Sequence, residues 1–240
     1  MLTKLAEVVD IVPELLELIK KDFAKELENP AIARLSKLVA DGTATFKEAN
    51  DLAVWTGKSL SFALKRNLTP GVLPDDKMYF NIADRLLGTL LKQDYELIAK
   101  ATEAVQTAMN RDMGLEVKAI KPKLNQDRVK GLVNRIANEE SFEKAKWLLD
   151  EPVINFSQSV VDDAIRANVD FLSKAGLQSM IVREVVGEAC DWCKEIAGSY
   201  PYPDIPDDVY RRHDRCRCTV VSYYGKTKQD VWSKVITEIK

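Results

Sequence analysis

Apolar residues recur at steps of three and four along most of the first 176 residues, which is the spacing of an amphipathic helix. The clearest run extends from Leu86 to Met109 and predicts one long helix. That helix begins after Pro74 and ends near Gly114, because proline and glycine mark helix boundaries. Similar runs predict further helices over Thr3–Lys20, Ala31–Ala40, Phe46–Asn67, Val129–Ile136, Phe142–Leu149 and Val160–Gly176.

The pattern changes after Gly176. Two short segments rich in β-branched residues, Ser179–Val186 and Thr219–Tyr224, predict strands, and a proline-rich loop separates them. A short helix is expected over about Lys228–Ile239. We therefore predict a mainly α fold in two domains. A helical body (1–176) precedes a small α+β module (177–240) with a hairpin-like sheet and a Cys/His metal site.

Composition narrows the classes of protein that fit. The chain has 35 basic and 37 acidic residues, a net charge of −2, and 46% hydrophobic residues, so it can bury a core. The missing surplus of positive charge argues against a protein that coats DNA. No apolar run reaches the roughly 18–20 residues of a membrane-spanning helix, and no export signal is recognisable, so we expect synthesis in a reducing cytoplasm.

The cysteines and the one histidine of the chain are clustered. Cys190 and Cys193 form a Cys-x-x-Cys pair, and His213 is followed by Cys216 and Cys218. Cys216 and Cys218 are two residues apart at the start of a predicted strand, so their side chains point to the same face of the sheet. The two pairs together supply the four sulfur ligands that a tetrahedral zinc ion requires, and His213 could replace one of them. We predict a structural zinc site, with the choice of four ligands left open.

Other interpretations of these residues remain. They could be core cysteines without metal, disulfides of an extracellular particle, or a redox Cys-x-x-Cys. A module of about 60 residues rich in loop has a marginal core, however, and a structural metal would stabilise it. A catalytic zinc is disfavoured, because the deaminase and His-Glu-x-x-His patterns are absent and no second histidine could act as a base. We therefore predict a protein without enzymatic activity.

Residues 211–217 form a basic segment with nearby aromatic residues. One interpretation is that its arginines grip a phosphate backbone while the aromatic residues stack on bases. The other is that the arginines form ion pairs with acidic residues of the preceding loop, while the tyrosines pack over the metal. The four arginines are Arg211, Arg212, Arg215 and Arg217, and the acidic residues are Asp204, Asp207 and Asp208.

The order of these motifs resembles a known family. A Cys-x-x-Cys (190–193), a Gly-x-Tyr turn (198–200) and a His-x-x-Cys-x-Cys ending (213–218) occur together in the C-terminal module of phage minor head proteins. This is the head-morphogenesis family named after the F protein of phage Mu, in the form found in phages and prophages of Gram-positive bacteria. Family members more often have proline where Asp214 stands. The resemblance covers about residues 180–224.

The resemblance implies a minor structural protein of a tailed-phage virion, made in the host cytoplasm and present in few copies in the head interior or at the portal vertex. It implies the portal protein or the capsid protein as partners, possible contact with packaged DNA, and no membrane. The role would be head assembly, or retention and ejection of DNA. Two alternatives are a sequence-independent DNA-binding protein with a basic zinc module, and a zinc-dependent hydrolase or toxin-like enzyme.

Overall fold

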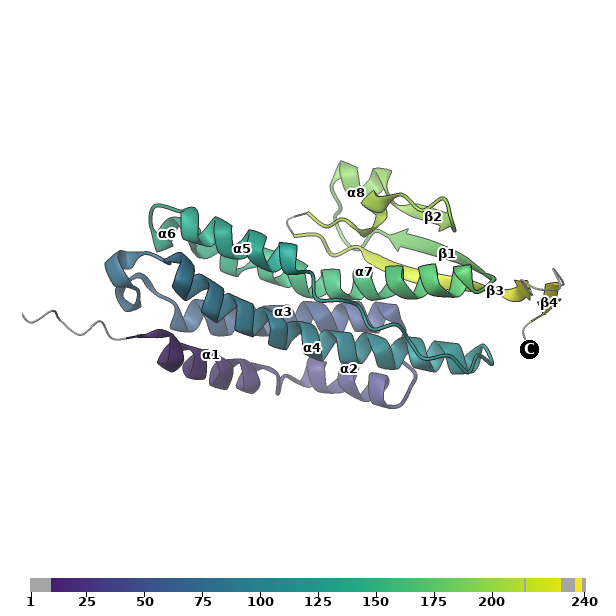
Figure 1. Ribbon diagram of the computed structural model, residues 1–240, viewed down its shortest axis with the longest axis horizontal. Helices are drawn as coiled ribbons and strands as arrows, with labels where there is room; N and C mark the ends of the chain where they lie inside the picture. The colour runs from purple at the N-terminus through teal and green to yellow at the C-terminus, as the bar shows by residue number, and fades with distance from the viewer. Residues whose placement is uncertain (1–9, 214, 230–235, 239–240) are drawn as a thin grey trace, which may run out of the picture.

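The computed structural model describes residues 10–213, 215–229 and 236–238. The fold is mainly helical, with a small antiparallel sheet at its C-terminal end, as the sequence predicts (Figure 1). The helices are α1 (Val12–Glu26), α2 (Pro30–Ala40), α3 (Phe46–Asn67), α4 (Phe80–Asp112), α5 (Gln126–Asn138), α6 (Phe142–Ala145), α7 (Glu151–Lys174) and α8 (Asp191–Glu195). The strands are β1 (Leu177–Glu184), β2 (Gly198–Pro201), β3 (Thr219–Gln229) and β4 (Ile236–Glu238).

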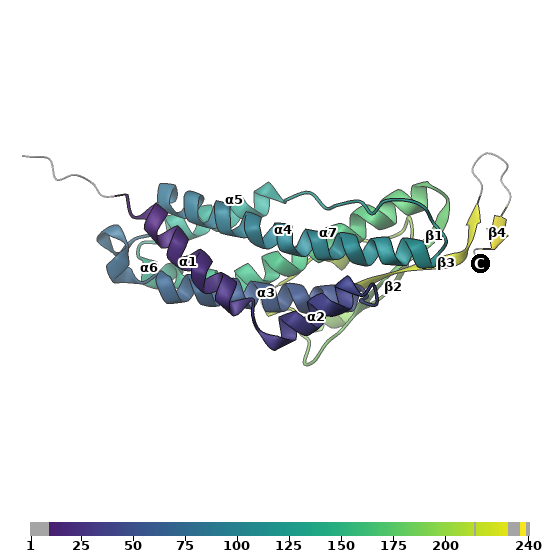
Figure 2. The ribbon, with the colours of Figure 1, turned by 90° about the horizontal axis from the view of Figure 1, so that it is seen from below.

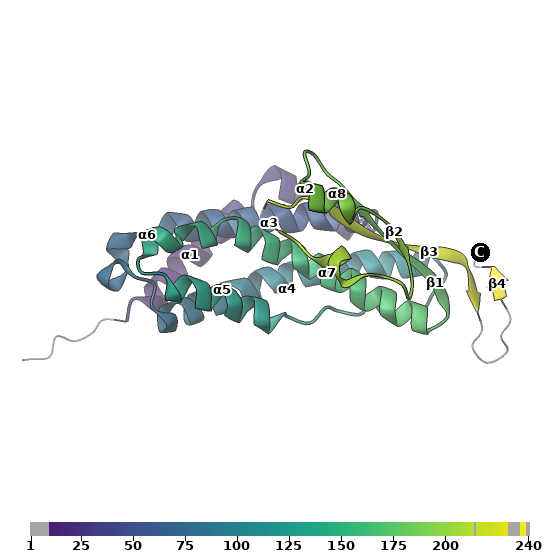
Figure 3. The same ribbon diagram turned by 90° about the horizontal axis from the view of Figure 1, so that it is seen from above.

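The long helices α3, α4 and α7 lie side by side along the molecule (Figures 1 and 2). In the view of Figure 1, α1 and α2 lie beneath them, while the sheet and α8 lie above α7. Figure 3 gives the view from above, in which the sheet lies over the helices. Among the described residues, no helix is both long enough and apolar enough to cross a membrane.

Local signals explain where the helices begin. Thr45 and Glu48 form a capping box at the start of α3: the Thr45 hydroxyl accepts from the amide of Lys47, and a Glu48 carboxylate oxygen accepts from the amide of Thr45. At the start of α2, Oδ1 of Asn29 accepts from the amide of Ala31, and Pro30 occupies the first turn. The expected first helix, Thr3–Lys20, is observed over Val12–Glu26, and residues 1–9 lie outside the described range.

Helices α3 and α7 pack closely at Gly57. A Cβ atom at this position would lie 2.5 Å from Oγ of Ser157 and 2.9 Å from Cα of Ile154, so only glycine permits this approach. Ser157 in turn donates a hydrogen bond to the buried carboxylate of Asp94 on α4. The three long helices therefore meet around a small polar contact, in an interior that is mostly apolar but buries further polar side chains such as Gln106 and Gln158.

The sheet has the strand order β2-β1-β3-β4, and all of its pairs are antiparallel. The buried positions of β1 alternate with exposed ones, as expected for a strand with one face on a core. Ile181 of β1 and Val220 of β3 belong to the same apolar cluster as the helical residues Leu60 and Leu87. The sheet is thus packed on the helices, and the boundary at residue 177 stays a prediction.

The expected closing helix over Lys228–Ile239 is wrong for the residues that the structure describes. Strand β3 continues to Gln229, and β4 occupies Ile236–Glu238. Lys228 pairs with Leu177 of β1 and with Thr237 of β4. Backbone pairing on two sides therefore outweighs the local helical pattern, as tertiary context commonly does. Residues 230–235 and 239–240 lie outside the described range.

Candidate metal centre

The first half of the candidate centre lies at the start of the short helix α8. Cys190 is the N-cap residue, and its Sγ accepts a hydrogen bond of 3.4 Å from the amide of Cys193. A separation of three residues places both sulfurs on one side of a single helical turn. Cys193 is buried, whereas Cys190 is exposed. The pair therefore offers one inner ligand and one outer ligand.

The second half is the segment that leads into β3. A turn in which the amide of Cys216 bonds the carbonyl of His213 brings the imidazole back towards α8. Nε2 of His213 lies 2.8 Å from Sγ of Cys193 and 3.3 Å from Sγ of Cys190. Cys216 and Cys218 are both buried beside Cys193. The two ends of the connection of about 20 residues between the halves therefore lie next to each other.

All five predicted ligand residues converge. Their ligand atoms form two groups, each with every atom within 4.8 Å of the others: Cys190, Cys193 and His213 make one, and Cys193, Cys216 and Cys218 make the other. Cys193 belongs to both groups. The four cysteines are free thiols, and the 3.8 Å between Sγ of Cys193 and Sγ of Cys216 far exceeds a disulfide bond of about 2.05 Å. This cluster could hold a metal ion.

Positive charge surrounds the sulfurs. Nη2 of the buried Arg183 lies 3.4 Å from Sγ of Cys216, and the buried Arg212 is close by. A hydrogen bond from Cys218, reinforced by the two guanidinium groups, lowers the pKa of Cys216 to about 4. The contact with Cys216, together with burial, raises the pKa of Cys218. Cys216 is therefore prepared to act as a thiolate ligand, the form that binds metals.

Three of the four arginines of residues 211–217 have an acidic partner in the described structure, and only one of these partners lies in the preceding loop. Arg211 pairs with Asp208 as one interpretation expects, at 2.9 Å. Arg212 instead forms a bidentate ion pair with Asp162 of α7, at 2.5 and 2.7 Å, and both side chains are 1% exposed.

Arg217 likewise pairs with a residue of α7. It makes two contacts of 2.9 Å with Glu151, and Arg215 is exposed. The acidic residue Asp207, a second expected partner, pairs with Arg166 of α7. The expected packing of the tyrosines also differs, because Trp192 covers the sulfurs while Tyr200, Tyr202 and Tyr210 pack on the main core.

Helix α7 therefore holds the segment that carries His213, Cys216 and Cys218 along one stripe of its surface. Glu151 binds Arg217, Asn155 donates to the carbonyl of His213 at 2.9 Å, and Asp162 binds Arg212. The three α7 residues are spaced by four and seven positions, so they lie on one face over about 16 Å. Sequence reasoning missed them, because partners from distant elements leave no local signal. Arg183 did have a local signal, because it occupies a buried-face position in a strand whose residues alternate between buried and exposed.

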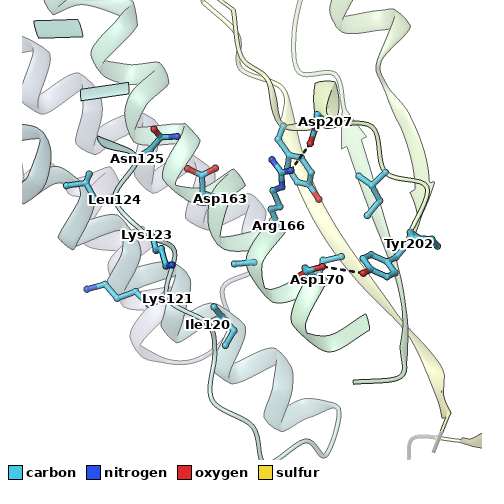
Figure 4. A pocket seen from close by; sticks show the side chains of 15 residues that line it. Ile120, Lys121, Lys123, Leu124, Asn125, Asp163, Arg166, Asp170, Tyr202 and Asp207 are labelled. Carbon is cyan, nitrogen blue, oxygen red and sulfur yellow. Dashed lines mark hydrogen bonds and ion pairs between the residues drawn. The ribbon is translucent and has the colours of Figure 1, made fainter. Parts of the chain in front are cut away.

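A groove of about 670 Å³ lies on the other side of the loop, between α7 and the connection from α4 to α5 (Figure 4). Arg166 pairs with Asp207 there, and the Tyr202 hydroxyl donates to Asp170. Burial raises the pKa of the neighbouring Asp163. None of the five sulfur and imidazole ligands lines this groove. It is therefore separate from the metal centre.

Comparison with known proteins identifies no relative of this chain. No family model matches the chain, and searches of curated proteins and of solved structures find no match. The resemblance to phage minor head proteins thus depends on the motif residues themselves.

Proposed function

We propose that this chain is a minor structural protein of a tailed-phage head, associated with the portal or capsid protein and acting in head assembly or in retention and ejection of DNA. One observation carries the proposal: the four cysteines and the histidine of the family-like motif converge on one Cys/His cluster. That cluster is fixed to a long helix by three side-chain contacts. Such an arrangement suits a rigid element that presents a surface to protein partners.

The proposed metal is zinc. Thiolate and imidazole are its usual ligands in closed structural sites, and a Zn–S distance of about 2.3 Å gives tetrahedral S···S separations of about 3.8 Å. Sγ of Cys193 and Sγ of Cys216 are 3.8 Å apart. The proposed ligands are Cys190, Cys193, Cys216 and Cys218, with His213 as the alternate fourth. When bound, zinc would stabilise the fold of the module.

The contacts of the arginines support a structural role over DNA binding. Arg212 and Arg217 are engaged by carboxylates of α7, so their charges are compensated within the molecule. Ion pairing inside the protein leaves fewer charges to displace counterions from a phosphate backbone. The burial of Cys193, Cys216 and Cys218 likewise favours a closed metal site over an enzyme's open one.

Purified particles of a phage that encodes this chain test the proposal. Mass spectrometry should find the protein in mature virions in few copies, and the isolated protein should bind portal oligomers. Deletion should leave heads that form and package DNA but infect poorly, and Cys193→Ser should reproduce this by unfolding the module. Arg211→Ala, which removes only an exposed ion pair, is the matched control and should infect normally. Absence from the particle, with turnover of nucleotide, peptide or glycan by the pure protein, would favour the enzyme alternative.

A further inference from the structure

Arg183 occupies a position where the strand pattern calls for an apolar residue. It follows Leu177, Ser179 and Ile181 on the buried face of β1, and it is 1% exposed. Its guanidinium lies 5.5 Å from the centre of the Trp192 ring, beside the sulfur cluster. A charged side chain at such a position is expensive unless something compensates its charge.

The contacts of Arg183 reach both halves of the cluster. Nη1 donates to the carbonyls of Val209 and Arg211, at 2.5 and 2.9 Å, in the segment just before His213. Nη2 lies 3.4 Å from Sγ of Cys216 and 3.9 Å from Sγ of Cys193. The guanidinium thus bridges β1, α8 and the second half of the cluster.

No carboxylate of the described residues compensates this charge. Within the part of the chain that the structure describes, no acidic side chain lies within ion-pair distance of Arg183, and its Nε has no hydrogen-bond partner. Arg212 is equally buried but has Asp162 beside it. An arginine keeps its charge in proteins, and among the described residues the sulfurs of Cys216 and Cys193 are the groups beside Arg183 that can carry the opposite charge.

We infer that Arg183 is a positioning residue of the metal centre. Its charge offsets the negative charge of a metal bound by three or four thiolates, and its fork holds the sulfurs and the segment before His213 in the binding arrangement. This inference depends on the metal centre of the proposed function and is independent of any role in a phage head. Residues that support metal ligands in this way typically contribute about 10–100-fold to metal affinity.

Metal titration of the full-length protein tests this inference. Zn²⁺ affinity is measured by competition with a chromophoric chelator, and thiolate ligation by the charge-transfer absorption of bound Co²⁺. We expect Arg183→Met to weaken Zn²⁺ binding by about 10–100-fold and to reduce the thiolate-to-cobalt absorption. Arg183→Lys should recover only part, because an ammonium group cannot contact two carbonyls and two sulfurs together. The matched control is Arg211→Met, two residues before His213 in sequence, whose side chain forms only an exposed ion pair with Asp208, and it should keep wild-type affinity.

The outcomes distinguish a failure of the inference on Arg183 from a failure of the proposed zinc site. Wild-type affinity in Arg183→Met, with helical circular dichroism intact, would overturn the inference and leave the zinc site standing. Failure of the wild-type protein to bind Zn²⁺ or Co²⁺ would overturn both. If Arg183→Met does not fold, Arg183→Lys decides: weakened binding supports the inference, and wild-type binding overturns it.

Discussion

The interior of the helical body and the interior of the C-terminal module differ in chemistry. The body buries a continuous set of leucine, isoleucine, valine and phenylalanine side chains from six helices, and burial of this kind needs no cofactor. The module has a separate small cluster of three cysteines, with a buried arginine beside it. The difference shows that one chain can combine a region stabilised by apolar burial with a region that shares this core but also buries a charge beside sulfurs and, by our proposal, binds zinc.

Loss of the metal should produce the largest difference in stability between the helical body and the module. Cys193 belongs to both ligand groups, so Cys193→Ser removes a ligand atom from each group and should abolish tight binding. Metal binding contributes about 10–16 kcal/mol in zinc-finger peptides, so its loss should strongly destabilise the module. Hydrogen exchange should show β1, α8 and the start of β3 losing protection while α4 keeps it.

The same experiment on zinc-depleted wild-type protein serves as a control without substitution. It should give the same pattern, and protection should return when zinc is added. Loss of protection in α4 at the same rate would show that body and module unfold as one unit, and that the predicted boundary at residue 177 does not separate two domains.

The next largest effect concerns the buried ion pair between the two regions. Asp162→Asn leaves the charge of Arg212 buried without its partner, which costs about 3–5 kcal/mol in comparable cases. Urea unfolding should show this loss. The control is Asp207→Asn, which breaks an exposed pair with Arg166 and should cost about 0–1 kcal/mol. Equal losses in both variants would contradict the view that this buried pair attaches the module.

The smallest effect is a dependence of the body on pH. Burial raises the pKa of Asp94 from 3.8 to about 7, although the Ser157 hydrogen bond acts in the opposite direction. The folded state therefore keeps a proton that the unfolded chain releases. The associated stability is complete below about pH 4 and is lost as the pH rises through 7, with a slope of about 1.4 kcal/mol per pH unit at most.

Asp94→Asn, which imitates the protonated acid, removes this titration. Urea unfolding of both proteins at pH 5 and pH 8 should show the variant gaining stability relative to wild type at the higher pH. If the free energies of unfolding of the two proteins change with pH in parallel, Asp94 is excluded as the source of the pH dependence.

The helices were predictable because their signals are local. The 3.6-residue period of α4 and the capping residues Thr45 and Asn29 act within a few neighbours. The closing segment was predicted wrongly because Lys228 takes its conformation from partners on β1 and β4. A pattern of side chains along one segment does not reveal such pairing.

The ligand residues could be predicted for a similar reason. The spacing from Cys190 to Cys193, and from His213 to Cys218, encodes turns that direct the ligand atoms. Their surroundings could not be predicted, since the partner of Arg212 is 50 residues away on α7 and that of Arg217 is 66 residues away. Those partners depend on how the module sits on the body.

The stripe on α7 also has a consequence for the order of events during synthesis. Glu151, Asn155 and Asp162 leave the ribosome before the residues that they bind, since His213 follows the end of α7 by roughly 40 residues, or about 2–8 s of translation. The helix can thus be docked in the bundle when its partners emerge. A chain that ends at residue 176 should therefore already hold α7 in the bundle, with Glu151, Asn155 and Asp162 in place to bind the later segment.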